Sequence, residues 1–210
     1  EFGCVPESHR FVTKQRFDCN WAQIIEGDLD TAHFSFLHMP APSEPSVYHP
    51  HSTADEKRLR WMRDDPMPQF EVLEHECGFV VAGARSADGQ KYWRMTQYMF
   101  PAHGTGPSTM PGETYHGFTI VPISNTACWA YAYSWNPERP LGDEERAKLD
   151  AGWGLVCERD ENYMPVRNAS NDFMIDRDEQ KHRTFTGVKG LAEQDSMIQH
   201  SQGPIVDRTR

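Results

Sequence analysis

Residues 20–38 read Asn-Trp-Ala-Gln-Ile-Ile-Glu-Gly-Asp-Leu-Asp-Thr-Ala-His-Phe-Ser-Phe-Leu-His, and the rest of the chain is organised around this stretch. It carries two histidines, His33 and His38, five residues apart, with three acidic residues shortly before them. Neutral imidazoles are good ligands for iron, zinc or copper, and a neighbouring carboxylate can fix which ring nitrogen faces the metal. The stretch is therefore a candidate metal-binding segment.

We expect residues 20–38 to form a helix. Asp30 precedes His33 by three residues, which places both side chains on one face of a regular helix. His38 follows His33 by five residues, and at about 3.6 residues per turn its ring points away from that face. If both histidines bind one ion, the helix must end, tighten or bulge between them, as helices often do at functional sites. From the spacing alone, a surface pair or a hydrogen-bonded core pair is the simpler interpretation.

The complete string favours a metal site more strongly than the spacing does. It follows the pattern Asn-Trp-x-Gln, then Glu-Gly-x-x-Asp-x-x-His-x-x-x-x-His. This pattern resembles the iron-binding segment in the catalytic domain of Rieske-type non-haem iron oxygenases, aromatic ring-hydroxylating enzymes, and in particular of their phthalate dioxygenase-like branch. The resemblance implies an α+β domain of the helix-grip (START/Bet v 1-like) class. Such a domain has a curved antiparallel sheet covered by helices, including a C-terminal helix.

The hydrophobic pattern of the remaining chain is typical of an α+β layout, with helices on one face of a curved sheet. A period of two predicts strands, with Asp88-Gly89 as a hairpin turn between two of them. The expected strands are 11–13, 70–74, 79–85, 92–100, 116–123 and 127–135. The expected later helices are 143–161 and 191–201, and the expected loops are 39–65, 103–112 and 163–188.

The strand expected at 127–135 has two different faces. Large aromatic residues occupy one face, and the small residues Cys128, Ala130 and Ala132 occupy the other. The small face either leaves room for a ligand or packs against a helix, and the sequence does not separate these alternatives.

An iron held by two histidines usually takes one carboxylate on the same face, which completes the facial triad of non-haem Fe(II) oxygenases. Spacing does not identify that carboxylate among the 31 acidic residues. The tail Glu-Gln-Asp-Ser-Met-Ile at 193–198, followed by Gly-Pro-Ile-Val-Asp-Arg at 203–208, resembles the C-terminal block of the same branch. The resemblance implies that Asp195 is the third ligand. Asp172, in a segment that also resembles the branch, is the second candidate, and without the resemblance Asp195 is a solvated helix acid.

The resemblance also assigns a role to Asp30. It implies a hydrogen bond from His33 to Asp30 and a second one from a histidine of a Rieske 2Fe-2S cluster in a neighbouring subunit. Electrons from NAD(P)H would arrive through a reductase or ferredoxin, and the assembly would be a homotrimer or a multiple of trimers. The Cys-x-His and Cys-x-x-His ligands of such a cluster do not occur in the chain. We therefore expect residues 1–210 to be a single catalytic domain. The Rieske domain then either lies in another part of a longer protein or is missing from the protein.

The composition limits the binding partners and the cellular compartment that we expect for this protein. The net charge of −10 argues against nucleic acid and against an acidic membrane surface, and it suits a basic electron-transfer partner. Five scattered cysteines without a Cys-x-x-Cys pair predict reduced thiols in a cytoplasmic protein. We find no apolar run long enough for a membrane span and no signal-peptide pattern.

The expected function is oxygenation of a small aromatic substrate with O₂ activated at mononuclear Fe(II). The reaction is dihydroxylation by a dioxygenase, or monohydroxylation or O-demethylation by a monooxygenase, and the sequence does not choose among these. Phe34, Phe36 and Met197 are the candidate substrate-binding residues, and no basic residue is recognisable as a carboxylate clamp. The alternatives are a non-catalytic helix-grip module that binds small ligands and a zinc hydrolase with Glu26 as general base. His49 and His51, in a His-Pro-His sequence, are either metal ligands or, as we expect, surface residues.

Overall fold

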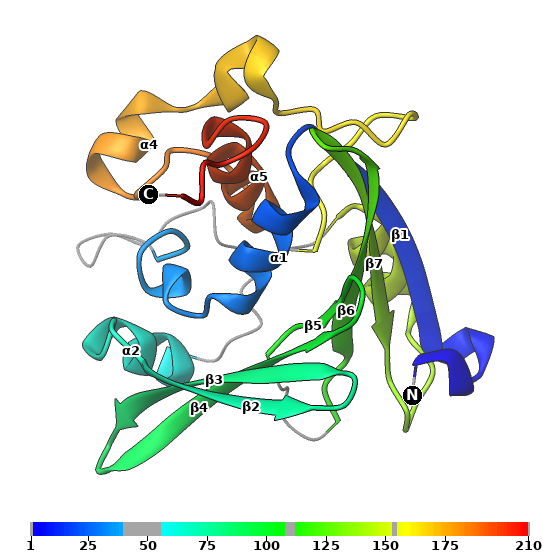
Figure 1. Ribbon diagram of the computed structural model, residues 1–210, viewed down its shortest axis with the longest axis vertical. Coiled ribbons are helices and arrows are strands. Elements are labelled where there is room, and N and C mark those ends of the chain that lie inside the picture. The colour runs from blue at the N-terminus through cyan, green and yellow to red at the C-terminus, as the bar shows by residue number, and fades with distance from the viewer. Residues whose placement is uncertain (1, 40–55, 108–111, 153–154, 210) are drawn as a thin grey trace.

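Seven antiparallel strands form one curved sheet in the computed structural model, which describes residues 2–39, 56–107, 112–152 and 155–209 (Figure 1). The strands are β1 (Arg10–Phe17), β2 (Gln69–His75), β3 (Gly78–Ala87), β4 (Gln90–Met99), β5 (His103–Thr105), β6 (Tyr115–Ser124) and β7 (Ala127–Trp135). Their order across the sheet is β1-β7-β6-β5-β4-β3-β2. The short β5 therefore joins the β2-β3-β4 meander to the half formed by β6, β7 and β1.

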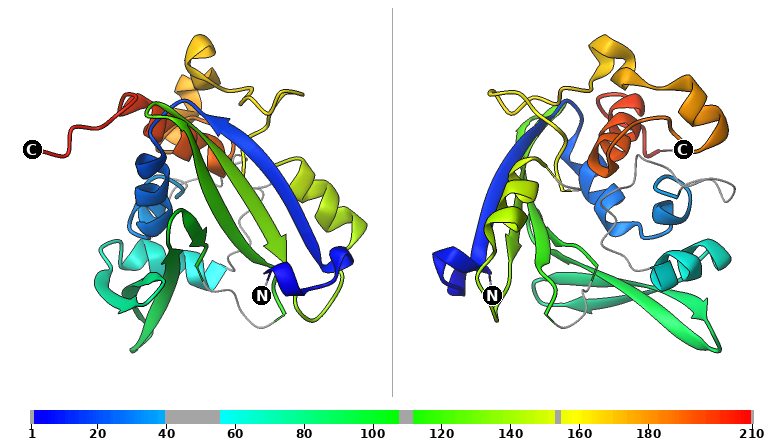
Figure 2. Two further views of the ribbon diagram at one scale, coloured as in Figure 1. Left: turned by 45° about the vertical axis from the view of Figure 1, so that its right-hand side comes forward. Right: turned by 180° about the vertical axis from the view of Figure 1, so that it is seen from behind.

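Helices lie within the bend of the sheet. The α-helices are α1 (Trp21–Leu29), α2 (Glu56–Asp64), α3 (Asp143–Asp150), α4 (Arg177–His182) and α5 (Leu191–Ser201). Short 3-10 segments are η1 (Phe2–Cys4), η2 (Glu7–His9), η3 (His33–Ser35) and η4 (Ala169–Met174), the last of which is kinked. Helices α1 and α5 contact each other between the two halves of the sheet, and α2 contacts β3 (Figures 1 and 2). This arrangement confirms the predicted α+β helix-grip class, with α5 as its C-terminal helix.

The core forms where α1 meets the middle of the sheet. Ile24 of α1 packs with Ile120 of β6 and with Cys128 and Ala130 of β7, all at most 3% exposed. The small-residue face of β7 is therefore packed against a helix at these positions. Removing this apolar surface from water is the main force that holds α1 against the sheet.

Several expected boundaries are wrong. The helix expected at 20–38 ends at Leu29, and the one expected at 143–161 ends at Asp150. Gly152 stops the latter, because its φ of +96° suits glycine and because a Cβ there would lie 2.5 Å from the Val156 carbonyl oxygen. The strand expected at 11–13 extends over the whole of β1.

The expected loops also contain regular structure. Helix α2 lies within the loop predicted at 39–65. Met62 is almost completely buried, but most of the other residues of this helix are charged, so few apolar residues mark it in the sequence. Strand β5 occupies part of 103–112, and η4 and α4 occupy part of 163–188, where Asn168 and Asp176 cap their first turns. His49 and His51 lie outside the described residues.

Two further findings concern the composition. The five cysteines are free, and three of them, Cys19, Cys128 and Cys157, are buried. Across the described ranges, each helix is too short or too polar to cross a bilayer.

Candidate metal centre

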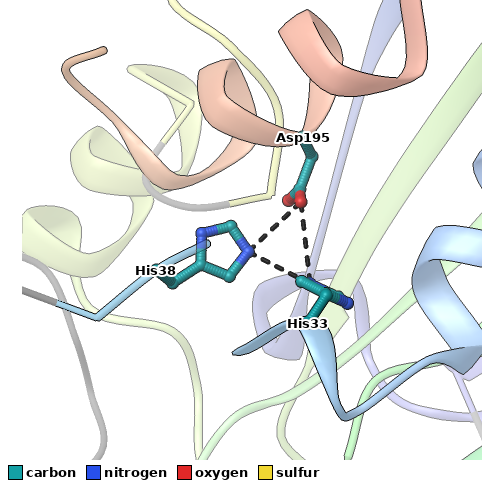
Figure 3. Close-up of side chains that lie close together, drawn as sticks. All are labelled: His33, His38 and Asp195. Atoms are coloured by element: carbon teal, nitrogen blue, oxygen red, sulfur yellow. Dashed lines mark hydrogen bonds and ion pairs between the residues drawn. The ribbon is translucent and has the colours of Figure 1, made fainter. Parts of the chain in front are cut away.

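Three side chains from two distant parts of the chain meet between α1 and α5 (Figure 3). The Nε2 atoms of His33 and His38 are 3.1 Å apart. The Asp195 Oδ1 atom, from α5, lies 3.2 Å from Nε2 of His38 and 3.6 Å from Nε2 of His33. The sequence-predicted ligand set is thus brought together at one point.

The spacing of these three atoms matches the donor set of a six-coordinate metal. Bonds of about 2.1 Å between a first-row metal and imidazole nitrogen place neighbouring corners of an octahedron about 3.0 Å apart. The observed separations of 3.1, 3.2 and 3.6 Å lie close to that value. Two imidazoles and one carboxylate on a single face are the donors that non-haem iron prefers.

The chain brings both histidines to one point by ending α1 before them. Asp30 caps the helix with an extended ψ of 98°, and its Oδ1 accepts a 2.8 Å hydrogen bond from the Ala32 N–H. The chain then tightens into η3, where the N–H groups of Phe36 and Leu37 both donate to the His33 carbonyl oxygen. We expected the helix to end, tighten or bulge between the histidines if both bind one ion; α1 instead ends before both of them, and the separate turn η3 begins at the first of them. The expectation that one helical face carries both Asp30 and His33 is wrong, because Asp30 is the residue at which α1 ends and His33 lies in η3.

Gln194 determines which nitrogen of His38 faces the site. Its Nε2 donates to the Val188 carbonyl oxygen at 3.0 Å, so its Oε1 must be the atom that faces Nδ1 of His38, at 2.8 Å. Nδ1 of His38 therefore carries the proton, and in the neutral ring Nε2 has a free lone pair. Both residues are buried, at 0% exposed for Gln194 and 5% for His38. Such partners of ligating histidines set ring orientation and ligand basicity.

The pKa values of these three residues depend on their burial and on the short distances between them. Burial lowers the pKa of His38, but the Asp195 charge and the hydrogen bonds that His38 donates to Asp195 and Gln194 outweigh burial and raise this pKa above its usual value. Burial raises the pKa of Asp195, but the two histidines outweigh it and hold this pKa below its usual value. Burial lowers the pKa of His33. The carboxylate is thus ionised and one imidazole is basic, which suits a cation at this position.

Asp30 lies beside the triad without belonging to it. Its Oδ2 is 4.0 Å from Nδ1 of His33, longer than a hydrogen bond, and its side chain is 46% exposed. Among the described residues, Nδ1 of His33 is buried and has no hydrogen-bond partner. Asp30 is therefore the acceptor best placed for that nitrogen, and it connects His33 with the protein surface.

The two other acids proposed from the sequence, Asp172 and Glu26, form ion pairs with arginines that are not part of the triad. Asp172 is exposed and forms an ion pair with Arg177 at 3.2 Å, away from the triad. Both oxygens of Glu26 accept hydrogen bonds of 2.8 Å from Arg208. Glu26 is therefore held at the surface, where it is a poor candidate for a general base.

The three predicted substrate-binding residues differ in position. The Phe34 ring lies 4.7 Å from the His38 ring and 4.9 Å from the His33 ring, measured between centroids. Phe36 is 47% exposed, and Met197 is partly buried on α5, two residues after Asp195. Of the three, Phe34 is the one that contacts the candidate ligands.

The sequence missed two residues at the site, Gln194 and Arg94. Arg94 of β4 is only 8% exposed, and its guanidinium lies 4.3 Å above the Phe34 ring. The sequence pattern did not show that Arg94 faces inward, because its direction depends on strand pairing: Gly83 of β3 pairs with it, and α1 contacts β4. No basic residue was recognisable in the sequence as a carboxylate clamp, and the structure shows that Arg94 is a buried cation beside Phe34.

A sequence profile of the family described as "LigXa C-terminal domain like" matches residues 1–210. The oxygenase subunit of phthalate 4,5-dioxygenase from Pseudomonas putida is 34% identical over 206 residues, covering 94% of this chain and 45% of that protein. The oxygenase subunit of 3-chlorobenzoate-3,4-dioxygenase from Comamonas testosteroni is 27% identical, covering 97% of this chain and 48% of that protein. The chain thus spans about half the length of these relatives. A structure of dicamba monooxygenase bound to 3,6-dichlorosalicylic acid is similar with 16% identity and a TM-score of 0.48, over 75% of this chain and 49% of that chain.

Replacing His33, His38 or Asp195 with Ala should reduce bound Fe(II) to near zero, because each substitution removes one of three donors. Metal analysis of anaerobically loaded protein measures this. Asp172→Ala is the matched control and should keep its iron. Full iron in either histidine variant, or loss of iron in Asp172→Ala with retention in Asp195→Ala, contradicts the assignment.

Gln194→Met should weaken Co(II) or Fe(II) binding about 10- to 100-fold, the usual cost of losing a partner of a ligating histidine. The thioether keeps the length of the side chain but is a far weaker acceptor for the His38 Nδ1 proton. Gln199→Met, at another buried glutamine of α5, is the control. Equal affinities for the two variants in a spectroscopic titration would show that Gln194 does not orient His38.

Proposed function

The chain belongs to the family of LigXa C-terminal-like domains, and from that membership we propose that it is the catalytic domain of a Rieske-type non-haem iron oxygenase. The proposal rests on one observation above all: His33, His38 and Asp195 converge with the spacing of a facial triad. Fe(II) held there would supply O₂ activation for the oxidation of an aromatic substrate. The outcome would be hydroxylation or O-demethylation.

Each residue of the site has a separate task in this proposal. His33, His38 and Asp195 would hold the iron, which would supply the activation of O₂. Gln194 keeps the proton on Nδ1 of His38, so that Nε2 remains a donor to the metal. Phe34 covers the histidines with an apolar wall and limits the access of water.

Asp30 provides the connection for electrons. It lies between the ligand His33 and the surface, with half-exposed carboxylate oxygens. We propose that this carboxylate meets the histidine of a Rieske 2Fe-2S centre in a neighbouring subunit of a trimer or a multiple of trimers. NAD(P)H would supply the electrons through a reductase or ferredoxin. The Rieske domain itself would lie outside residues 1–210.

The substrate proposed is an aromatic carboxylate. Arg94 is a buried cation, and in the described part of the chain no carboxylate lies within 4.0 Å of it. Its Nε–H donates to Thr31 Oγ1, and its guanidinium stacks on Phe34, a wall of the proposed iron site. A planar guanidinium suits a carboxylate, and an aromatic face beside it suits a ring. Phthalate and 3-chlorobenzoate, which name the two relatives, are both aromatic carboxylates.

Two alternatives carry less support. A non-catalytic helix-grip module would have no need for three converging metal donors, and iron content separates it from an oxygenase. A zinc hydrolase would need a carboxylate base close to metal-bound water. Glu26, its candidate base, is engaged by Arg208.

Asp30→Asn should preserve the fold and most of the iron, because the substitution keeps the size and removes the charge of a residue that is not a ligand. In the full-length protein, turnover with NAD(P)H and reductase should fall about 10- to 100-fold or more. Peroxide-driven product formation, which bypasses the cluster, should persist in part. Complete loss of iron would make Asp30 a ligand, and normal turnover would show that electrons take another path.

Arg94→Met should weaken the binding of benzoate or phthalate about 10- to 100-fold, since hydrogen bonds to a charged group contribute about 1.5–3 kcal/mol. The weak binding of neutral benzamide should stay unchanged. Calorimetric titration of the metal-loaded chain measures both ligands, with Arg16→Met as a control at an exposed arginine. Equal losses for benzoate and benzamide would mean that Arg94 shapes the pocket without recognising the charge.

A further inference from the structure

Arg85 of β3 is the largest side chain that is almost completely buried, at 1% exposed. Its guanidinium lies behind the segment from Thr31 to Ser35, on the side of that segment that faces the sheet. The segment contains His33. None of the roles described so far involves this arginine.

The guanidinium of Arg85 donates to both ends of that segment. One terminal nitrogen donates to the Thr31 carbonyl oxygen at 2.7 Å and to Ser35 Oγ at 3.2 Å. The other donates to Thr31 Oγ1 at 3.4 Å, an oxygen that also accepts from Arg94 at 2.9 Å. The two acceptor residues are two positions before and two positions after His33. A rigid, forked donor therefore spans the ligand from behind.

The sheet beneath the segment is shaped to receive it. A Cβ at Gly83, two residues before Arg85, would lie 2.4 Å from the methyl carbon of Thr31. Thr31, which is 3% exposed, can sit this close to β3 because residue 83 has no side chain. The glycine and the arginine together define where Thr31 lies relative to the sheet.

Filling this space with an arginine carries an unfavourable free energy of burying a charge. In the described part of the chain no carboxylate lies within 4.0 Å of Arg85, Asp65 and Asp30 act on its charge only from farther away, and its Nε is buried without a partner. Burial of a charge without an opposite charge in contact is unfavourable, and an apolar side chain of similar volume often gives equal or greater stability. Packing alone therefore does not account for an arginine here, whereas the carbonyl and hydroxyl acceptors of the His33 segment do.

We infer that Arg85 is a positioning residue that holds His33 in register with His38 and Asp195 by fixing both ends of the Thr31–Ser35 segment. The inference rests on the proposed metal site and extends it from the ligands to the sheet behind them. His38 and Asp195 are held by other elements, so loss of Arg85 should release one imidazole and leave the other two donors in place.

The test compares Arg85→Met with Arg159→Met. The side chain of Arg159 is 9% exposed and also donates to a threonine hydroxyl and a backbone carbonyl, those of Thr13 and Asp150. Unlike Arg85, it also lies 3.8 Å from a carboxylate, that of Asp150, and none of its hydrogen-bond or ion-pair partners among the described residues belongs to the metal site. Co(II) affinity is followed by visible absorption, the thermal unfolding of the metal-free chains by circular dichroism, and the number of imidazoles on Cu(II) by pulsed EPR.

Arg85→Met should bind Co(II) about 10- to 100-fold more weakly than the wild type and show one coordinated imidazole in place of two. Arg159→Met should keep wild-type affinity and two imidazoles, whatever its unfolding temperature. Wild-type affinity and two imidazoles in Arg85→Met would overturn the inference. If that variant does not fold, Ser35→Ala decides: a loss of about 2- to 5-fold in affinity supports the role, because one neutral acceptor is removed, and an unchanged affinity overturns it. Failure of the wild type to bind Co(II) would instead refute the proposed iron site.

Discussion

Three electron-pair donors, Nε2 of His33, Nε2 of His38 and Oδ1 of Asp195, are held within 3.1–3.6 Å of one another in a largely buried place. Lone pairs and a carboxylate charge repel at such distances unless a cation or a proton lies among them. The hydrogen bond to Gln194 places the exchangeable proton of His38 on the far nitrogen, so a neutral ring does not supply that proton. This constraint explains the chemistry of the site, because a divalent metal satisfies all three donors at once.

The fold can be understood as the frame that maintains this convergence. The apolar contact of Ile24 with β6 and β7 fixes α1, and the contact of α1 with α5 brings Asp195 towards the histidines. Behind the His33 segment the sheet presents polar groups instead of apolar ones, since Arg85 and Arg94 both donate to Thr31. One face of the segment therefore carries the candidate ligand His33, and the other is tied to β3 and β4.

The sequence predicted the site better than it predicted the surrounding structure. Through their family resemblance, the string from Asn20 to His38 and the Gln-Asp block named the three side chains that the structure brings together. Arg85 and Arg94 escaped notice, since an arginine in an alternating strand usually faces solvent, and their inward direction depends on strand pairing and on the position of Thr31. Helix α2 was missed for a related reason: it contacts β3, but its sequence is mostly charged and has few apolar residues to mark it. Local patterns record chemistry and capping, whereas these features depend on contacts between residues far apart in the chain.

The central claim is that one iron binds to two imidazoles and one carboxylate of this chain. Iron K-edge X-ray absorption of the Fe(II)-loaded protein tests it most directly, because the fine structure reports the number and type of the nearest atoms. The account predicts a first shell of nitrogen and oxygen at about 2.1 Å, with the outer-shell scattering of two imidazole rings. A sulfur shell, or outer-shell scattering from no ring or from more than two, would contradict it.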